Sequence, residues 1–374
     1  MKRSFKVILL CVLAALFTFT ACTTAPTESQ NGSEALSDAQ SAGYETSDTV
    51  STEESTDMID RTWPYVTGTF IQPWAFSGYT EKKWENHLET LLEAGIDTVI
   101  VQWSCTTPYG KFSDAYFNAA PSDDQKAPGG YTEYAVMIPR LLKVSEEMGV
   151  KVFLGLNIAD EWWTEAASQP DWYRNQAEVG KQVAHSLYDL YKEKYPNAFA
   201  GWYFAWEYYN GLGYVDQAAE FLNLYLDELT LIDPELPLML SPFVRNSVDV
   251  QATEAEWKAI FAKTRFREGD IFCCQDAVGA GHITIDQMDG YFAALKRACD
   301  TVDGLVFWAN NENFDQSTWT PAPLERFVRQ MNIASKYVSG YVTFAYSHYY
   351  APDIIGTDDY HNEYVKYYNT GSLD

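Results

Sequence analysis

Short apolar runs alternate with longer amphipathic segments from residue 68 to the end of the chain. Eight of these runs are rich in β-branched and aromatic residues, which is typical of buried strands. They begin near Gly68, Thr98, Lys151, Phe199, Pro237, Asp270, Gly304 and Tyr341. Seven intervening segments repeat apolar residues with a helical period. These predicted helices span residues 80–94, 133–148, 172–194, 217–231, 254–263, 285–299 and 323–337.

This order of elements predicts the fold class. Continuous apolar strands that are each followed by a crossover helix are typical of a parallel sheet covered on both faces. Eight such units in about 300 residues fit a single-domain (β/α)8 TIM barrel better than an open doubly wound sheet, although periodicity alone does not separate the two. Thr80 and Thr284 stand where helix N-caps are expected, and Gly95 and Gly149 stand where helices should end.

The first 60 residues differ from this pattern. Residues 1–21 join a basic start to a short apolar run, which predicts a secretory signal peptide. Phe19-Thr20-Ala21-Cys22 resembles the lipobox of bacterial lipoproteins, in which the cysteine is lipidated, although Phe19 replaces the usual leucine. Residues 23–60 carry nine acidic and no basic residues and almost no large apolar ones, so we expect a disordered acidic linker over 22–60. The barrel would then occupy 61–374, on an extracytoplasmic lipoprotein anchored to the bacterial membrane through Cys22.

Charge and missing motifs narrow the possible functions. The formal charge is −26, and residues 61–374 account for −20 of it, with 23 basic and 43 acidic residues. Such a body disfavours nucleic acid and polyanionic glycans, because both need clustered lysine and arginine. There is no zinc spacing of cysteines, no phosphate-binding glycine loop and no G-x-S-x-G motif, so the sequence implies no metal or cofactor. Cys105, Cys273, Cys274 and Cys299 read as core thiols, with a disulfide between two of them left open.

Polar and aromatic residues follow the predicted strands. In a (β/α)8 barrel the active site lies at the carboxyl ends of the strands, so these residues should gather there. Aromatic rings stack on the C–H faces of sugars, and amides and carboxylates bind hydroxyl groups, so the mixture favours a neutral or weakly charged carbohydrate as partner. The residues predicted to bind this substrate are Gln72, Trp74, Gln102, Trp103, Asn157, Glu161, Trp162, Gln275, Asp276, Asn310 and His348.

Two glutamates are the candidates for catalysis. Glu207 ends the fourth predicted strand and Glu312 ends the seventh, on facing sides of an eight-stranded ring. Two carboxyl groups in a dry, aromatic pocket can cleave a glycosidic bond without a cofactor, because one protonates the leaving oxygen while the other stays ionised. Asp276 is the alternative to Glu312 as the second carboxylate.

The position of these glutamates resembles the acid/base and nucleophile of the large clan of retaining glycoside hydrolases with (β/α)8 barrels. The motifs GTFIQPW, GWYFAWE, CQDAVG and FWANNENF are similar to a family of secreted bacterial barrels known as a glycosidase-like domain of unknown function, over roughly residues 64–350. This resemblance implies that Glu207 is the acid/base and Glu312 the nucleophile. The clan often has asparagine before the acid/base, where this chain has Trp206, so contact with the sugar 2-hydroxyl would fall to Asn310, Gln275 or Asn157.

Each assignment has a structural alternative. Glu207 could be a structural carboxylate bonded to Arg245 or to a tyrosine, and Glu161 fits binding or capping better than catalysis. Trp74, Trp103 and Trp206 could be core residues, and Trp206 has the opposite pleat from Glu207. Trp162 and Trp163 suit a sugar platform or lid, and His348 suits either the pocket or the barrel rim. A carbohydrate-binding lipoprotein without activity is the main competing function; a barrel hydrolase of amides or esters fits less well.

Overall fold

The computed structural model describes residues 61–117, 134–164 and 168–374. The predicted signal peptide, Cys22 and the predicted linker lie outside these residues. Arg61–Asp374 forms one compact unit. In the described parts of this unit, no helix has the length and apolar character needed to cross a membrane.

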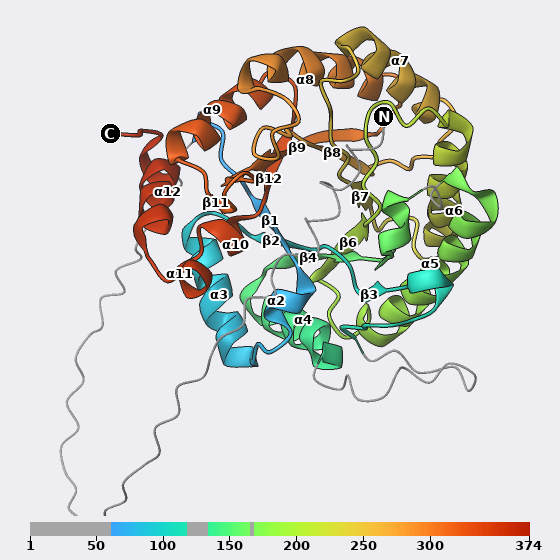
Figure 1. The fold of residues 1–374 in the computed structure, drawn as a ribbon. Helices are drawn as coiled ribbons and strands as arrows, with labels where there is room; N and C mark the ends of the chain where they lie inside the picture. Colours follow the sequence, from blue (N-terminus) through green and yellow to red (C-terminus); the bar gives the residue numbers. More distant parts are fainter. Residues whose placement is uncertain (1–60, 118–133, 165–167) are drawn as a thin grey trace, which may run out of the picture. The chain divides into compact units, whose positions relative to one another are not determined.

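Eight parallel strands close into a barrel surrounded by helices (Figure 1). β1 pairs with β2 on one side and with β12 on the other, with Gly68 opposite both Thr98 and Val342. This closure confirms the (β/α)8 barrel and rules out the open sheet. The strands are β1 (Gly68–Ile71), β2 (Thr98–Val101), β4 (Lys151–Gly155), β6 (Phe199–Phe204), β7 (Leu238–Leu240), β8 (Ile271–Gln275), β9 (Val306–Glu312) and β12 (Gly340–Phe344).

An outer ring of helices covers the strands. The ring contains the seven predicted helices, α3 (Glu81–Glu93), α4 (Met137–Met148), α5 (Pro170–Tyr191), α6 (Val215–Ile232), α7 (Val250–Phe261), α8 (Ile285–Cys299) and α9 (Leu324–Ala334), and one more, α12 (Asp359–Thr370). The sequence analysis missed α12 because its buried face consists of His361, Tyr364 and Tyr367 rather than aliphatic residues.

Helix ends follow the expected chemistry. The side chain of Thr80 accepts a hydrogen bond from the Lys83 amide at the start of α3, and Thr284 forms a capping box with Gln287 at the start of α8. Gly149 ends α4 with φ of 73°, a left-handed conformation that glycine adopts at little cost.

Short elements extend the carboxyl ends of the strands. β3 (Cys105–Thr106) pairs with β5 (Asn157–Ile158), and β10 (Phe314–Asp315) forms a hairpin with β11 (Thr320–Pro321). The short helices are α2 (Pro73–Phe76), α10 (Tyr346–Tyr349), α11 (Pro352–Ile355) and the 3-10 turns η1 (Pro108–Gly110), η2 (Tyr134–Val136) and η3 (Asp160–Trp163). Most of the predicted site residues lie on or beside these elements.

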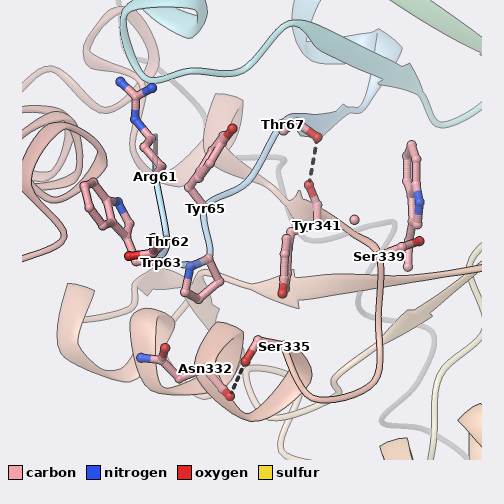
Figure 2. A pocket seen from close by; sticks show the side chains of 12 residues that line it. Arg61, Thr62, Trp63, Tyr65, Thr67, Asn332, Ser335, Ser339 and Tyr341 are labelled. Carbon is pink, nitrogen blue, oxygen red and sulfur yellow. Dashed lines mark hydrogen bonds between the residues drawn. The ribbon is translucent and has the colours of Figure 1, made fainter. Parts of the chain in front are cut away.

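The segment that leads into β1 lies at the opposite end of the barrel, where the strands begin. Residues 61–67 run along an open cavity of about 730 Å³ before β1 begins (Figure 2). Helix α12 holds this segment, because the Tyr367 hydroxyl donates to the Pro64 carbonyl at 2.6 Å and the Val66 amide donates to the Tyr364 hydroxyl at 2.9 Å. The cysteines predicted as core thiols, Cys105, Cys273, Cys274 and Cys299, are buried and free.

Candidate active site

Glu207 lies at the carboxyl end of the barrel, three residues beyond β6, and is partly exposed. Within the described residues its carboxylate has one hydrogen-bond partner, the Gln275 side-chain amide, with Nε2 at 3.4 Å from Oε1. Burial raises the pKa of Glu207 to about 7, against the smaller opposing effect of Gln275. A carboxyl group with this pKa can give and take a proton near neutral pH. Among the described residues, neither Arg245 nor a tyrosine donates a hydrogen bond to this carboxylate.

The backbone around Glu207 is held by aromatic residues packed behind the barrel. Trp206 points away from the interior, as its pleat predicted, and its indole donates to the Tyr225 hydroxyl at 3.0 Å. The indole of Trp162 donates to the Glu207 carbonyl at 3.1 Å, and its ring stacks on Tyr208. Trp162 is buried in this packing. Its prediction as a sugar platform is therefore wrong, because the neighbouring rings already cover its faces.

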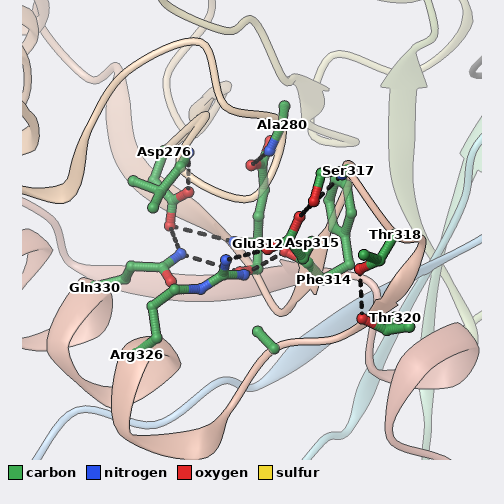
Figure 3. Close-up of polar contacts among 12 residues, drawn as sticks. Asp276, Ala280, Glu312, Phe314, Asp315, Ser317, Thr318, Thr320, Arg326 and Gln330 are labelled. Carbon is green, nitrogen blue, oxygen red and sulfur yellow. Dashed lines mark hydrogen bonds and ion pairs between the residues drawn. The ribbon is translucent and has the colours of Figure 1, made fainter.

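Glu312 ends β9 and is only 1% exposed. Its Oε2 atom accepts a hydrogen bond from the Ala280 amide at 2.7 Å (Figure 3). Gly279 lets this loop approach, since a Cβ there would come within 2.9 Å of the Glu312 Cβ atom. Burial and then the nearby Asp276 carboxyl raise the pKa of Glu312 well above the usual range of a glutamate.

Asp276 does not reach the site that was predicted for it. Its side chain is fully buried and points toward α9, where its Oδ2 atom accepts from Gln330 at 2.5 Å, Asn311 at 2.9 Å and the Glu312 amide at 3.2 Å (Figure 3). Its Oδ1 atom accepts from the Val278 amide at 3.1 Å. Both oxygens of Asp276 are occupied by N–H donors, so these contacts do not support its predicted roles as alternative nucleophile or sugar ligand. It holds the end of β9, which carries Glu312.

Two other amides that were predicted together, Asn310 and Gln275, lie opposite each other on β9 and β8 and both contact Ser241. Asn310 donates to the Ser241 hydroxyl at 3.0 Å, and Gln275 donates to the Ser241 carbonyl at 2.8 Å. The side-chain oxygens of Asn310 and Gln102 are buried without a hydrogen-bond partner in the described residues. Buried, unpaired oxygens cost free energy, and a ligand hydroxyl would offset that cost.

The predicted residues after β4 have structural contacts. Asn157 is fully buried, accepts from the Tyr225 hydroxyl at 2.9 Å and donates to the Thr107 hydroxyl and to Gln176. Because its oxygen and its amide are occupied by Tyr225 of α6, Gln176 of α5 and Thr107, its prediction as a sugar ligand is wrong. Glu161 accepts a hydrogen bond from the Tyr109 backbone amide in η1 at 3.2 Å.

The first and eighth strands meet in an aromatic part of the mouth. Trp74 is 45% exposed, so its core alternative is wrong, whereas Trp103 is buried in the core. The centroid of the Trp74 ring lies 6.4 Å from that of His348. The Nε2 atom of His348 accepts a hydrogen bond from the backbone amide of Gln72 at 3.0 Å. Burial, with a smaller effect of His87, lowers the pKa of His348 to about 4, so the ring is neutral at neutral pH.

A buried chain of hydrogen bonds supports this part of the mouth. His87 on α3 contacts Asp353 through Nδ1 at 3.0 Å and the Ser347 hydroxyl through Nε2 at 3.0 Å. The arrangement has the order of a hydrolytic triad, but Ser347 and His87 are fully buried. The chain of contacts instead braces α10, which carries His348.

The sequence analysis missed two features of the mouth. Trp319, in the β10–β11 hairpin, is 39% exposed and stacks on Phe314 with 5.8 Å between ring centroids. Arg245, which follows β7, lies over the rings of Tyr209 and Phe243. Both residues lie a few positions beyond a strand end, and that position was the available signal. Within the described residues, no group of three or more His, Cys, Asp or Glu side chains is arranged to hold a metal ion.

These features are those of a (β/α)8 barrel with carboxyl groups at its mouth. The chain belongs to the family described as Domain of unknown function (DUF4434), which is matched over residues 66–356. The family expected from the sequence motifs is thereby confirmed.

Solved structures share the fold at low sequence identity. A Bacteroides thetaiotaomicron protein, provisionally described as an alpha-L-fucosidase, matches with a TM-score of 0.64 and 23% identity, over 82% of this chain and 96% of that one. A beta-galactosidase from Marinomonas ef1 matches with a TM-score of 0.50 and 10% identity, over 81% of this chain and 59% of that one. No curated protein sequence matches the chain. The structural neighbours are glycoside hydrolases, and this likeness establishes a common fold.

Proposed function

We propose that this protein is a glycoside hydrolase that cleaves a neutral or weakly charged glycan with retention of configuration. The observation that carries the proposal is the Glu207 carboxyl, which is partly exposed at the barrel mouth and has its pKa raised to about 7. The glycosidase names of proteins with the same fold support this reading.

Each carboxyl group has a distinct role in the proposed reaction. Glu207 in its protonated form donates to the leaving glycosidic oxygen, while ionised Glu312 attacks the anomeric carbon and forms a glycosyl–enzyme ester. Glu207, now ionised, takes a proton from water, and this water releases the sugar from Glu312. The Ala280 amide, which donates to Glu312, favours its ionised form and so favours attack.

Other side chains that follow the barrel strands fit a sugar as the ligand. Trp74 and Trp319 present exposed indole faces, which can stack on the C–H face of a sugar ring. Asn310 and Gln102 offer oxygen atoms that lack a partner in the described residues, and a sugar hydroxyl can donate to them.

The direct test is release of reducing ends from a panel of glycans. We expect hydrolysis by the wild type, its loss in Glu207→Gln, and no change in Glu178→Gln, which alters an exposed glutamate on α5. NMR of the first product should show the anomeric configuration of the substrate. Full activity of Glu207→Gln would reject its role, and an inverted first product would reject the retaining mechanism.

Binding of carbohydrate without cleavage is the second candidate function. The near-complete burial of Glu312 and its raised pKa favour it, because a protonated, enclosed carboxyl is a poor nucleophile. Glycans that bind to the protein but release no reducing ends would support this function over hydrolysis.

We also propose that the chain is exported and anchored to the bacterial membrane by a lipid on Cys22. The sequence of residues 1–22 supports this proposal. Growth with an alkyne fatty acid should label the full chain in the membrane fraction, and Cys22→Ser should abolish the label. Labelling that persists in this variant would contradict the proposal.

A further inference from the structure

Arg245 is a cation at the barrel mouth that forms no ion pair with an acidic group among residues 61–117, 134–164 and 168–374. It lies five residues beyond β7 and is partly buried. Its guanidinium carbon lies 3.9 Å from the centroid of the Tyr209 ring and 5.0 Å from that of Phe243. These aromatic contacts orient the guanidinium but do not satisfy its N–H donors.

The other arginines in the described residues all donate side-chain hydrogen bonds to carboxylates, carbonyls or amide oxygens; they are Arg61, Arg140, Arg174, Arg265, Arg267, Arg297, Arg326 and Arg329. Arg245 makes no such side-chain bond in the same residues, and its Nε atom is buried. Acidic partners are abundant, since residues 61–374 carry 43 of them. A partly buried guanidinium without an anion costs free energy, which a ligand could offset.

Arg245 is fixed to the segment that carries Glu207. The Asn210 side chain accepts from the Arg245 amide at 2.7 Å and donates to the Arg245 carbonyl at 3.0 Å. Phe243 pairs through its backbone with Tyr209 on one side and Gln275 on the other, and Gln275 is the residue that contacts Glu207. The Arg245 guanidinium and the Glu207 carboxyl are therefore carried by chain segments that are hydrogen-bonded to one another.

His282 supplies a second uncommitted donor in the same place. Its ring stacks on Phe243 with 5.1 Å between centroids and has no hydrogen bond in the described part of the chain. Burial and then the positive charge of Arg245 lower the pKa of His282, so the ring is neutral at neutral pH. A neutral imidazole still carries one N–H, so Arg245 and His282 together can donate to an anion.

We propose that Arg245, assisted by His282, binds one anionic group of the glycan, a carboxylate or a sulfate, next to the sugar held at Glu207. The planar guanidinium matches such oxyanions with two parallel hydrogen bonds. The acidic body disfavours polyanions in general, so a single cation here selects glycans with one charge at a defined place. This inference names the substrate class of the proposed function and rests on that function.

The test compares glycans that differ in one charge. The Glu207→Gln variant, which should bind without turnover, is applied to an array that pairs hexuronate oligosaccharides with their carboxyl-reduced forms and 6-O-sulfated ones with unsulfated forms. We expect an anionic member to bind at least ~10-fold more tightly than its neutral partner, as charge-assisted hydrogen bonds imply. The two arms of the array distinguish carboxylate from sulfate.

Variants of Arg245 then test whether this residue causes the preference for the anionic glycan. Arg245→Gln should abolish the difference within each pair, Arg245→Lys should retain part of it, and Arg174→Gln on α5 should leave it intact. Because the paired glycans are compared on one protein, a failure of Arg245→Gln to fold would not remove the test. Equal binding of neutral and anionic partners would overturn the inference.

The inference and the proposed function can fail separately. Anionic glycans that bind through Arg245 but are not cleaved by the wild type would support the inference and contradict hydrolysis. Neutral glycans that are cleaved without any charge preference would support hydrolysis and contradict the inference. If no glycan on the array binds, both are contradicted.

Discussion

The two carboxyl centres of the barrel mouth differ in how tightly the protein holds them. Glu207 is partly exposed and has one long hydrogen bond, from Gln275. Asp276 and Glu312 are buried side by side, and Asp276 alone accepts four hydrogen bonds. A carboxyl group with few hydrogen bonds, such as Glu207, can exchange its proton with a ligand. A carboxyl group whose oxygens are all hydrogen-bonded, such as Asp276, can only position its neighbours.

The same contrast explains why the carboxyl pKa values rise for different reasons. For Glu207 the cause is burial alone, and the one hydrogen bond opposes it. For Glu312 the negative charge of Asp276 adds to burial. Removing the charge of Asp276 should therefore lower the pKa of Glu312 and leave the pKa of Glu207 unchanged. The following experiments test this difference between the two centres.

The largest effect should come from Glu207→Gln. Loss of a general acid costs about 10²–10⁴-fold in rate, so kcat on a cleaved glycan should fall by ~10³-fold. The measurement is steady-state release of reducing ends, with Glu178→Gln as the control. A rate within about threefold of wild type would mean that this lightly held carboxyl is not the acid/base.

Glu312→Ala should also remove most turnover, about 10²-fold or more, because the glycosyl–enzyme ester cannot form. Azide at high concentration should restore part of the rate and yield a glycosyl azide of inverted configuration, detected by mass spectrometry and NMR. Activity in this variant without azide would place Glu312 with Asp276 among the positioning residues.

Asp276→Asn should act mainly on stability. The variant replaces one acceptor oxygen by an NH2 group, a donor that would face existing N–H donors, and breaking such a buried network costs about 2–4 kcal/mol. Denaturant unfolding monitored by tryptophan fluorescence measures this loss. In the remaining folded protein the pKa of Glu312 should fall, because a like charge is gone, while that of Glu207 should stay unchanged. Equal shifts of both would contradict the separation of the two centres.

The pH dependence should report Glu207. Since its acidic form predominates below its pKa of about 7, kcat/KM should fall about tenfold per pH unit above that pH.

The raised pKa of Glu207 also predicts that folding stability falls as the pH rises. The unfolded chain releases this proton near pH 4.3, so folding stability declines between that pH and about 7. Glu207→Gln should remove this part of the decline, and thermal unfolding at pH 4 and pH 8 measures it. A decline of the same size in the variant would contradict the pKa of Glu207.

The smallest effect should come from the aromatic rim. Trp74→Ala removes an exposed stacking face, and the loss of about 1 kcal/mol should raise KM roughly fivefold with little change in kcat. Leu231→Ala, which alters an exposed residue at the end of α6, is the control. A change in kcat without a change in KM would show that Trp74 acts on the carboxyl groups rather than on the sugar.

The fold followed from the sequence because most of the barrel strands are buried on both faces. Such strands appear as continuous apolar runs, and β1, β2, β4 and β6 begin at the residues that the pattern indicated, Gly68, Thr98, Lys151 and Phe199. The last outer helix was missed because tyrosines fill its buried face.

The site was predicted less well, because strand ends indicate position but not direction. Gln275 and Asp276 are adjacent, yet one points to Glu207 and the other to α9. Trp162 and Asn157 follow β4 as expected, but residues distant in sequence use their polar atoms. The sequence offered Arg245 only as a partner of Glu207, and the structure showed that it has no anionic partner among the described residues.

The contacts of α12 with residues 61–67 bring the two ends of the barrel domain together. The Arg61 side chain donates to the Tyr368 carbonyl at 2.9 Å, and Gly371 packs beside Trp63. Since both ends meet at the side of the barrel opposite Glu207, a short peptide could join residue 374 to residue 61. The domain is thus suited to circular permutation, and a fusion partner attached at either end of the domain would leave the mouth open.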